Sequence, residues 1–408
     1  METFQPKLRF PEFKGDWERK KIDDVSELTS SKRVYLSDYV EIGIPFFRGK
    51  EITELKQNKQ PSDILYITEK SYNEFKLKYG VPQINDILMT AVGTLGNVYK
   101  IRDNKPFYFK DGNLIWFRDI KENSDFFEIL LDYKNNDIQK TSIGSTQRAL
   151  TMVELRKLFF FFPSIEEQTK IANFLSSVDE KLNLLKEKKE LLEEYKKGMM
   201  QKIFNQEIRF KDDDGNDFED WEEKTLGEVA KFRRGSFPQP YGLPKWYDDE
   251  NGMPFIQVYD VGENMLLKHN TKNKISKIGA EQSVFVKKGT LVISIQGSIG
   301  RIAKTQYDAY VDRTLLIFQS YNLPIDVDYF KYVVFLLFEI EKTKAPGGTI
   351  KTITKEALTD FEVPIPSIEE QTKIANFLSA LDEKIELVST QIEETQEYKK
   401  GLLQQMFV

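Results

Sequence analysis

Apolar residues recur with a four-three spacing along two stretches of the chain, residues 163–204 and 366–407. A seam with a period of 3.5 residues is typical of helices that pack against another helix. Two such helices in one chain most simply pair with each other, so we predict an antiparallel coiled coil. The alternative is that each helix lies on the surface of its own domain. The seam residues are Ile171, Leu175, Val178, Leu182, Leu185, Leu192, Met199 and Ile203 in the first stretch, and Ile374, Leu378, Leu381, Ile385, Val388, Ile392, Leu402 and Met406 in the second.

The two stretches are copies of one another, offset by 203 residues without a gap. Residues 163–176, Pro-Ser-Ile-Glu-Glu-Gln-Thr-Lys-Ile-Ala-Asn-Phe-Leu-Ser, are identical to residues 366–379, and 26 of the 42 positions are identical overall. Each copy opens with a proline and with Ser and Glu at capping-box spacing, which is typical of a helix start. The regions between the copies match only sparsely. The chain therefore presents one surface twice, to like partners, and two different surfaces to two different ligands.

The regions outside these helices are faintly related and predict a mixed α/β domain in each half of the chain. Residues 17–25 parallel residues 221–229, and residues 45–52 parallel residues 254–261. Residues 86–96 and 290–300 each read as a strand that runs into a Gly-x-x-Gly turn. Residues 125–131 and 328–334 read as helices, and the phenylalanine run at residues 159–162 reads as a buried strand.

One further match predicts a circular order of elements. Residues 204–210, Phe-Asn-Gln-Glu-Ile-Arg-Phe, follow the first helix and resemble residues 4–10, Phe-Gln-Pro-Lys-Leu-Arg-Phe. The second helix ends at Phe407, where such a segment would come next. We therefore expect adjacent termini and a pseudo-two-fold axis through the helices. The expected division is 1–162 (α/β domain), 163–204 (helical repeat), 205–223 (acidic linker), 224–365 (α/β domain) and 366–408 (helical repeat).

The charge distribution permits nucleic-acid binding without requiring it. The net charge is −6. Residues 205–223 contribute −7 (2 Lys/Arg, 9 Asp/Glu) and the second helical repeat −4 (4 against 8). Both α/β regions are mildly basic, at +2 (26 against 24) for residues 1–162 and +3 (19 against 16) for residues 224–365.

Several kinds of chemistry are disfavoured by composition. The chain has no cysteine, which removes disulfides and thiolate sites and favours a cytoplasmic location. Its single histidine, His269, lies in a polar context that reads as a solvated loop, so a histidine-ligated zinc site or a serine–histidine triad is not expected. The Gly-x-x-Gly turns lack the Walker ending, and no apolar run reaches the ~18 residues of a membrane span. We expect a binding protein rather than an enzyme.

Duplex DNA suits a pseudo-two-fold protein with two dissimilar basic domains on a spacer. A two-fold protein matches half-sites about 34–36 Å apart or a multiple of that distance. A helix of 42 residues spans about 63 Å at 1.5 Å per residue. Dissimilar domains imply dissimilar half-sites and therefore an asymmetric, bipartite target.

The chain resembles the specificity subunits of Type I restriction–modification enzymes over essentially its full length. The likeness is carried by the two Pro-Ser-Ile-x-Glu-Gln helix starts and by the Ile-Ala-x-Phe-Leu-x-x-x-Asp that follows each, at residues 171–179 and 374–382. The Trp-x-x-x-x-[Ile/Leu]-x-[Asp/Glu]-Val openings and the Gly-[Thr/Ser]-[Leu/Ile]-Gly turns complete the pattern. Duplicated in this order, the motifs are highly specific.

This resemblance implies a fold and a set of partners. Each α/β region is expected to be a target recognition domain for one half of a split double-stranded DNA sequence. The helical repeats are expected to set the spacer and to dock two methyltransferase subunits, which use S-adenosylmethionine to methylate adenine. Two restriction (motor-nuclease) subunits that require ATP and Mg²⁺ can join them. The chain itself would then be non-catalytic, with no cofactor of its own and no membrane partner.

Candidate DNA contacts lie in polar loops and directly after two aligned strands. Arginine can pair bidentately with guanine and glutamine with adenine, whereas lysine more often holds phosphate. For Arg148, phosphate contact or a surface salt bridge is an equal alternative. The candidates are Arg48, Ser145, Thr146, Gln147, Arg148, Gln257, Thr349 and Lys351.

Partner docking is expected at the identical helix starts, through Glu167, Gln168, Phe174, Glu370, Gln371 and Phe377. The alternative is that these residues only cap the helices and fill a joint common to both halves. Other functions stay open: the specificity subunit of a methylation-only system, a self-contained methyltransferase or nuclease, or an adaptor that binds only proteins. The target sequence and spacer length do not follow from motifs, because base readout depends on loop geometry.

Overall fold

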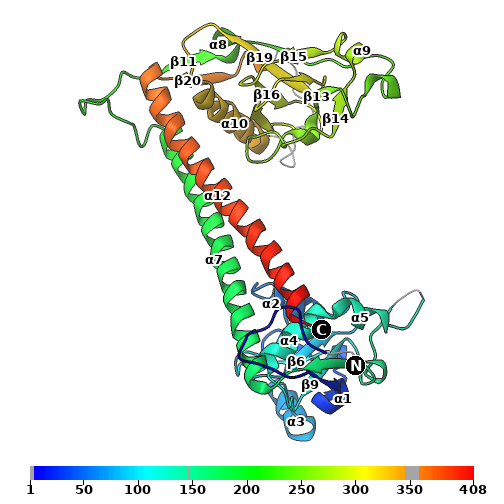
Figure 1. Cartoon of the computed structure of the whole chain (residues 1–408). Helices are drawn as coiled ribbons and strands as arrows, with labels where there is room; N and C mark the ends of the chain where they lie inside the picture. Colours follow the sequence, from blue (N-terminus) through cyan, green and yellow to red (C-terminus); the bar gives the residue numbers. More distant parts are fainter. Residues whose placement is uncertain (1–3, 146–147, 345–357) are drawn as a thin grey trace. The chain divides into compact units, whose positions relative to one another are not determined.

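The computed structural model describes residues 4–145, 148–344 and 358–408, and the chain divides into two compact units (Figure 1). Unit 1 comprises Met1–Leu185 and Gln391–Val408, and unit 2 comprises Lys186–Thr390. Each unit therefore combines one α/β domain with a part of each long helix, α7 (Ile165–Phe204) and α12 (Ile368–Met406). None of the helices in the described ranges has an apolar stretch long enough to cross a membrane.

In unit 1, the described strands form two four-stranded sheets and a two-stranded ribbon. The first sheet has the order β2-β9-β6-β7, and all neighbours are antiparallel. The second has the order β3-β5-β4-β8, and β4 and β8 are parallel. The strands are β1 (Glu18–Lys21), β2 (Glu27–Thr29), β3 (Tyr39–Val40), β4 (Ile44–Phe47), β5 (Leu65–Ile67), β6 (Ile87–Thr90), β7 (Val98–Lys100), β8 (Tyr108–Phe109), β9 (Leu114–Arg118) and β10 (Phe159–Phe162). The helices besides α7 are α1 (Ile22–Val25), η1 (Leu36–Asp38), α2 (Gly49–Lys56), α3 (Glu69–Tyr79), α4 (Ser124–Tyr133), α5 (Asn135–Lys140) and α6 (Met152–Leu155).

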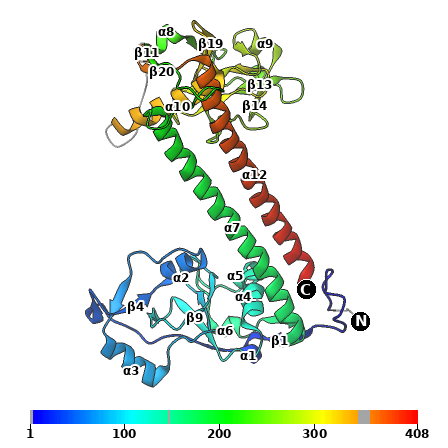
Figure 2. The same cartoon turned by 90° about the vertical axis from the view of Figure 1, so that its left-hand side faces the viewer.

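The first sheet of unit 1 is covered on both faces. Ile87 and Met89 of β6 pack in a core with α4 and the start of α7, whereas Leu88 packs on the other side with Ile52 of α2 and Phe109 of β8. Figure 2 shows α4 and α5 on the side of this domain next to α7, and α2 and α3 away from it. A strand that is buried on both faces reads as a continuous apolar run rather than an alternation.

Unit 2 repeats this architecture. Its sheets have the orders β12-β19-β16-β17 and β14-β13-β18-β15, and β1-β10 of unit 1 corresponds to the ribbon β11-β20. The strands are β11 (Glu222–Thr225), β12 (Ala230–Arg234), β13 (Met253–Ile256), β14 (Asn273–Ile275), β15 (Val284–Val286), β16 (Leu291–Ser294), β17 (Ile302–Lys304), β18 (Ala309–Val311), β19 (Leu315–Tyr321) and β20 (Glu362–Ile365). The helices besides α12 are α8 (Leu226–Val229), η2 (Pro244–Trp246), η3 (Val258–Asp260), α9 (Lys277–Ala280) and α10 (Val327–Lys344).

The second sheets differ at their edges. Both contain an antiparallel neighbour and a parallel neighbour of one central strand, β4 in unit 1 and β13 in unit 2. In unit 1 the fourth strand, β3, pairs beyond β5, whereas in unit 2 the fourth strand, β15, pairs with β18 at the opposite side. The second sheets of the two units therefore share three strands but place the fourth strand at opposite edges.

The predicted elements are present. Residues 125–131 and 328–334 lie in α4 and α10, and both Gly-x-x-Gly segments follow a strand of the first sheet. The run at residues 159–162 is the strand β10, but it is half-buried, because Phe160 and Phe162 face the core while Phe159 is 39% exposed.

The two long helices run antiparallel within each unit. In unit 1, Ile171 and Leu175 of α7 share a core with Leu402 and Met406 of α12. In unit 2, Ile203 near the end of α7 shares a core with Ile374 and Leu378 near the start of α12. Lys196 and Lys399 stand where the four-three spacing calls for an apolar residue, and they make equivalent ion pairs, Lys399 with Asp179 in unit 1 and Lys196 with Asp382 in unit 2.

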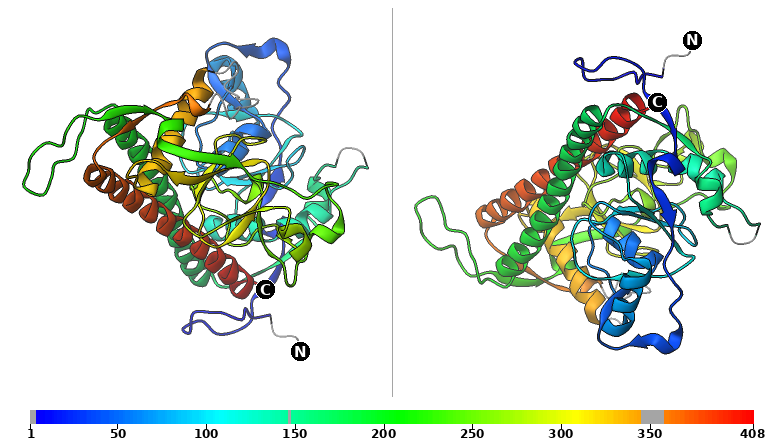
Figure 3. Two further views of the ribbon diagram at one scale, coloured as in Figure 1. Left: turned by 90° about the horizontal axis from the view of Figure 1, so that it is seen from above. Right: turned by 90° about the horizontal axis from the view of Figure 1, so that it is seen from below.

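The segment at residues 4–10 lies beside the end of α12 within unit 1 (Figure 3). The Leu8 N–H donates to the Gln405 carbonyl (2.8 Å), and Phe407 packs edge-on against Trp17 (6.2 Å between ring centroids). In unit 2, Phe204 at the end of α7 meets Trp221 in the same way (6.3 Å). The adjacency expected from the circular order of elements is therefore present in unit 1.

Candidate nucleic-acid interface

Each unit has one pair of parallel neighbours among its described strands, and the chain that leaves these strands carries polar residues. The carboxyl ends of parallel strands meet at the same edge of a sheet, where α/β proteins commonly bind ligands. We call these places the carboxyl edges. In unit 1, β4 is followed by Arg48 and β8 by Lys110 and Asp111; in unit 2, β13 is followed by Gln257 and β18 by Asp312 and Arg313.

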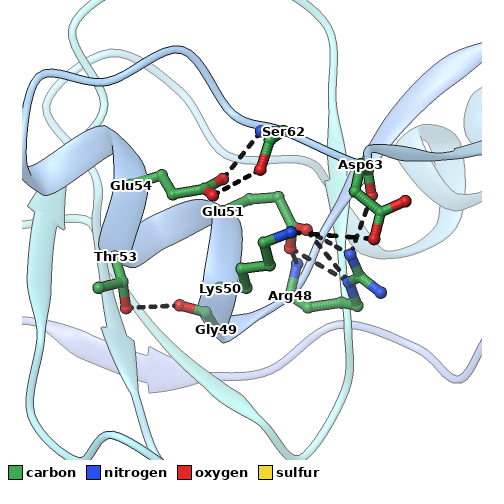
Figure 4. Close-up of polar contacts among 8 residues, drawn as sticks. All are labelled: Arg48, Gly49, Lys50, Glu51, Thr53, Glu54, Ser62 and Asp63. Carbon is green, nitrogen blue, oxygen red and sulfur yellow. Dashed lines mark hydrogen bonds and ion pairs between the residues drawn. The ribbon is translucent and has the colours of Figure 1, made fainter. Parts of the chain in front are cut away.

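Arg48 is held firmly at the carboxyl edge of unit 1 (Figure 4). Its Nη2 donates to Glu51 Oε1 (2.5 Å) and to the Asp63 carbonyl (3.0 Å), and its backbone N–H donates to Glu51 Oε2 (2.6 Å). Glu51 is fully buried, and its hydrogen bond raises the pKa of the Arg48 guanidinium further above the usual value. Since the Arg48 side chain is only 28% exposed, most of its donors serve the fold.

Two exposed lysines flank Arg48. The Lys110 N–H donates to the Phe47 carbonyl (2.9 Å), which fixes the chain after β8 next to the end of β4. Lys50, in the first turn of α2, has its Nζ 3.8 Å from Asp63 Oδ2. Compact ammonium groups at the ends of flexible stems suit phosphate oxygens.

Gln257 occupies in unit 2 the position that Arg48 occupies in unit 1. Both residues are N-caps in a capping box, with Glu51 and Asp260 at the third helical position, so the predicted alignment is confirmed. Gln257 is only 5% exposed, and its Oε1 accepts hydrogen bonds from the Tyr259 hydroxyl and from Asn273 Nδ2 (2.7 Å). Burial therefore favours a role in fixing Tyr259 over direct contact with a base.

The polar loop of unit 1 lies against the Gly-x-x-Gly turn. Val92 and Ala149 form an isolated β-bridge, and a Cβ on Gly49 would lie 3.9 Å from the Val92 carbonyl. The loop, the turn and the start of α2 thus meet on one side of the domain. Of the predicted loop residues, Ser145 and Arg148 are exposed, and Arg148 Nη2 donates to the Gln139 carbonyl (2.8 Å). Thr146, Gln147, Thr349 and Lys351 lie outside the described residues.

The Gly-x-x-Gly turns have the same construction in both units. Their glycines are left-handed, with φ of +81° and +77° at Gly93 and Gly96 and of +73° and +85° at Gly297 and Gly300. A hydroxyl at the end of the preceding strand closes each turn. Thr90 Oγ1 accepts from the Asn97 N–H (2.9 Å), and Ser294 Oγ accepts from the Arg301 N–H (2.9 Å).

The identical helix starts bind segments of their own units. In unit 1, Arg9 Nε and Nη2 donate to the two carboxylate oxygens of Glu167, both at 2.7 Å. In unit 2, Arg209 donates to the two oxygens of Glu370 at 3.3 and 2.8 Å. The aromatic neighbours repeat as well, with Phe10 against Phe174 (5.9 Å between centroids) and Phe210 against Phe377 (5.8 Å).

The expectation that Glu167 and Glu370 are surface residues is therefore wrong, because they are 1% and 0% exposed. Gln168 and Gln371 are buried too, and their Oε1 atoms accept from the backbone N–H groups of Asn123 and Asp326. Each helix start is buried because it binds a segment of its own unit, residues 4–10 in unit 1 and residues 204–210 in unit 2. This segment is itself repeated along the chain. Their identity in both copies fits the joint-filling alternative, and docking of a partner at the helix starts stays a prediction for the half-buried Phe174 and Phe377 and the residues around them.

The capping boxes at these helix starts are only half formed. Ser164 Oγ accepts from the Glu167 N–H (3.4 Å), and Ser367 Oγ accepts from the Glu370 N–H (3.3 Å), as predicted. The glutamate side chains do not return to the cap, because the arginine of the preceding segment binds them.

Lys110, Asp312 and Arg313 at the carboxyl edges were not singled out from the sequence. A further internal match in the sequence could have indicated them. Tyr108-Phe-Lys-Asp111 and Tyr310-Val-Asp-Arg313 cover equivalent positions, counted from the pairing with β4 and β13. At the last position unit 1 has an aspartate and unit 2 an arginine. No group of three or more His, Asp or Glu side chains that could hold a metal ion occurs in the described ranges.

Two related α/β domains with different polar edges, joined by long helices, define a class of modular proteins with two distinct ligand surfaces. Comparison with known families identifies the class. The family described as Type I restriction modification DNA specificity domain matches residues 14–194 and 218–397, once for each domain with its helix. The chain belongs to this family of specificity subunits of Type I restriction–modification enzymes.

Individual relatives agree with this assignment. The chain is 26% identical over 421 residues to a putative type I restriction enzyme MjaX specificity subunit of Methanocaldococcus jannaschii, covering 97% of this chain and 94% of that protein. It is 24% identical to the MjaVIII specificity subunit of the same organism, covering 97% and 92%. The S subunit of a Type I system from M. genitalium has a similar fold, with a TM-score of 0.63, 18% identity and 99% of each chain covered.

Proposed function

We propose that the chain reads a bipartite, asymmetric DNA sequence, with one half-site bound by each α/β domain. The observation that carries this proposal is the double match to the DNA specificity domain, at residues 14–194 and 218–397. Two similar readers in one chain account for two half-sites. Their different carboxyl edges account for two different half-site sequences.

Methylation and cleavage are then performed by partner subunits that the chain directs to the site in the cytoplasm. Two methyltransferase subunits use S-adenosylmethionine to methylate adenine, and two restriction subunits use ATP and Mg²⁺. Support comes from the relatives, which are named specificity subunits, and from a solved structure of similar fold (TM-score 0.58, 17% identity, 95% of each chain) described as concerning complex assembly of a type I restriction–modification system. A methylation-only assembly would use the chain in the same way.

Large side chains exposed at matched positions of the two long helices suit two copies of one partner. Leu184 and its mate Leu387, offset by 203 residues, are 58% and 60% exposed. Tyr195 and Tyr398 are 51% and 55% exposed. Large apolar side chains at matched exposed positions are a better docking surface than the buried helix starts.

Exchange of one domain tests the two-reader proposal. The full chain and its methyltransferase subunit would be produced together in cells, and long-read sequencing would map the methylated motif. Replacing residues 1–162 with the corresponding region of a relative should change one half of the motif, and replacing residues 205–365 should change the other. A swap that alters both halves, or neither, would refute the proposal. Methylation or cleavage by the purified chain alone would instead indicate a self-contained enzyme.

A further inference from the structure

Arg313 stands in a rigid turn at the carboxyl edge of unit 2. The Asp312 N–H donates to the Ile256 carbonyl (3.0 Å), and Asp312 Oδ1 accepts from the Thr314 N–H (2.9 Å). The turn is also packed from the other side, since a Cβ on Gly235 would lie 2.3 Å from the Asp312 carbonyl oxygen. The backbone that presents Arg313 is thus fixed by hydrogen bonds and by close packing.

The guanidinium of Arg313 is exposed and rests on an aromatic ring. Its central carbon lies 5.5 Å from the centroid of the Tyr241 ring. Tyr241, 57% exposed, packs in turn on Phe237 (4.4 Å between centroids), which is buried and lies 5.6 Å from Phe255. No hydrogen bond or ion pair engages Arg313 within the described ranges. Its donors are free, while its position is restrained.

The other arginines of unit 2 lack this combination of free donors and a restrained position. Arg233 Nε donates to the Arg234 carbonyl (3.2 Å). Arg209 binds Glu370, and Arg301 binds Glu263 (2.9 Å). Arg234 is exposed at the end of β12, and it lies near the Arg313 turn because its register partner on β19 is Leu316 and the next residue, Gly235, packs on Asp312. No aromatic ring lies under Arg234 within the described ranges, which makes it a suitable comparison: it has the same charge close to the same turn, although on the first sheet, without the same restraint.

We propose that Arg313 reads a guanine in the half-site bound by unit 2, with Tyr241 holding the plane of its guanidinium. This inference rests on the proposed DNA-reading function. Arginine presents two parallel N–H donors that match guanine O6 and N7 in the major groove. A phosphate contact needs only charge, whereas a base contact needs the fork in a set plane, which the ring and the rigid turn supply. The equivalent position of unit 1 is Asp111, which pairs with Arg33 (3.3 Å), so the two units differ here in sign of charge.

The test uses the full chain in complex with its methyltransferase subunit. Motif mapping in cells would give the parent motif, and purified complexes would be assayed on duplexes in which each base pair of the motif is replaced in turn. Arg313→Ala should lose about 5- to 150-fold of the discrimination at one guanine-containing position of a single half-site. Arg313→Lys, which keeps the charge but not the fork, should lose most of the same discrimination. Arg234→Ala should weaken binding uniformly across sequences and reduce the salt dependence.

The possible outcomes separate this inference from the proposed function. If the parent complex methylates no bipartite motif, the proposed function fails. If the parent does so and Arg313→Ala weakens binding equally on all duplexes, Arg313 contacts phosphate and the guanine assignment is refuted. Unchanged recognition by Arg313→Ala refutes it as well. Because Arg313 is exposed, hydrogen exchange of unit 2 should match the parent; Tyr241→Leu should cause a smaller loss at the same position.

Discussion

Replacing Glu370 by glutamine should destabilise unit 2 by about 2–4 kcal/mol. Glu370 is fully buried and accepts hydrogen bonds from Arg209 (2.8 and 3.3 Å) and from Trp221 Nε1 (2.8 Å). Glutamine has a similar shape but one acceptor oxygen, and its amide NH2 would face the guanidinium. Arg209 Nη2 and Trp221 Nε1 both donate to Oε2, so the glutamine oxygen can keep these two bonds, and the bond from Arg209 Nε to Oε1 is lost. A hydrogen bond to a charged group contributes ~1.5–3 kcal/mol, and the two remaining bonds weaken because their acceptor is no longer charged. The arginine side chain is 21% exposed, and water recovers part of that loss.

The matched variant is Glu167→Gln in unit 1, which should cost less, about 1–3 kcal/mol. Among the residues that the structure describes, the carboxylate of Glu167 accepts from Arg9 alone, at 2.7 Å to each oxygen. The tryptophan that corresponds to Trp221 is Trp17, whose buried Nε1 has no hydrogen-bond partner in the described part of the chain. The hydrogen bond from Trp221 Nε1 to Glu370 is therefore the difference between the two helix starts. Trp221→Phe combined with Glu370→Gln should therefore be less destabilising than the sum of the single changes.

Hydrogen exchange measured by mass spectrometry is the suitable assay, because two units can open separately and a single melting temperature would mix them. Glu370→Gln should speed exchange at residues 204–225 and 362–378 and leave residues 4–21 unchanged. Glu167→Gln should do the reverse. Equal exchange in parent and Glu370→Gln would show that the Arg209–Glu370 joint contributes no net stability.

Three further changes test other parts of the structure. Leu182→Asp places a charge at a seam position that is 6% exposed and should strongly destabilise the chain; an unchanged melting curve would contradict the seam. Gly96→Ala should cost more than Gly93→Ala, because both glycines are left-handed but only at Gly96 would a Cβ meet another atom, 2.0 Å from Asn135 Oδ1; equal unfolding midpoints would refute this. Burial raises the pKa of Asp86, so its stabilising contribution is present in acid and lost as the pH rises; Asp86→Asn should gain stability relative to the parent as the pH rises above the ordinary aspartate pKa, and the opposite trend in denaturant titrations would refute the assignment.

The sequence by itself determined the elements whose signals are local or repeated. A 3.5-residue apolar period predicts the long helices, because the side chains that must be buried recur on one face. The internal repeat aligned the strands, the Gly-x-x-Gly turns and the positions of Arg48 and Gln257, because each copy must satisfy the same backbone geometry. The sequence also marked the exposed residues Ser145 and Arg148, although it did not indicate the bridge between Val92 and Ala149.

Only the tertiary structure decided which of the repeated polar residues face solvent. Glu167 and Glu370 looked like a duplicated outer surface, yet each is buried under an arginine some 160 residues away, a distance in sequence that no local pattern reports. Likewise, β13 and β18 bring Gln257 and Arg313 to one edge through parallel pairing of strands more than fifty residues apart. Register and burial are properties of the assembled sheets and joints. For that reason the repeat predicted where functional residues occur, and packing determined which of them are free to bind.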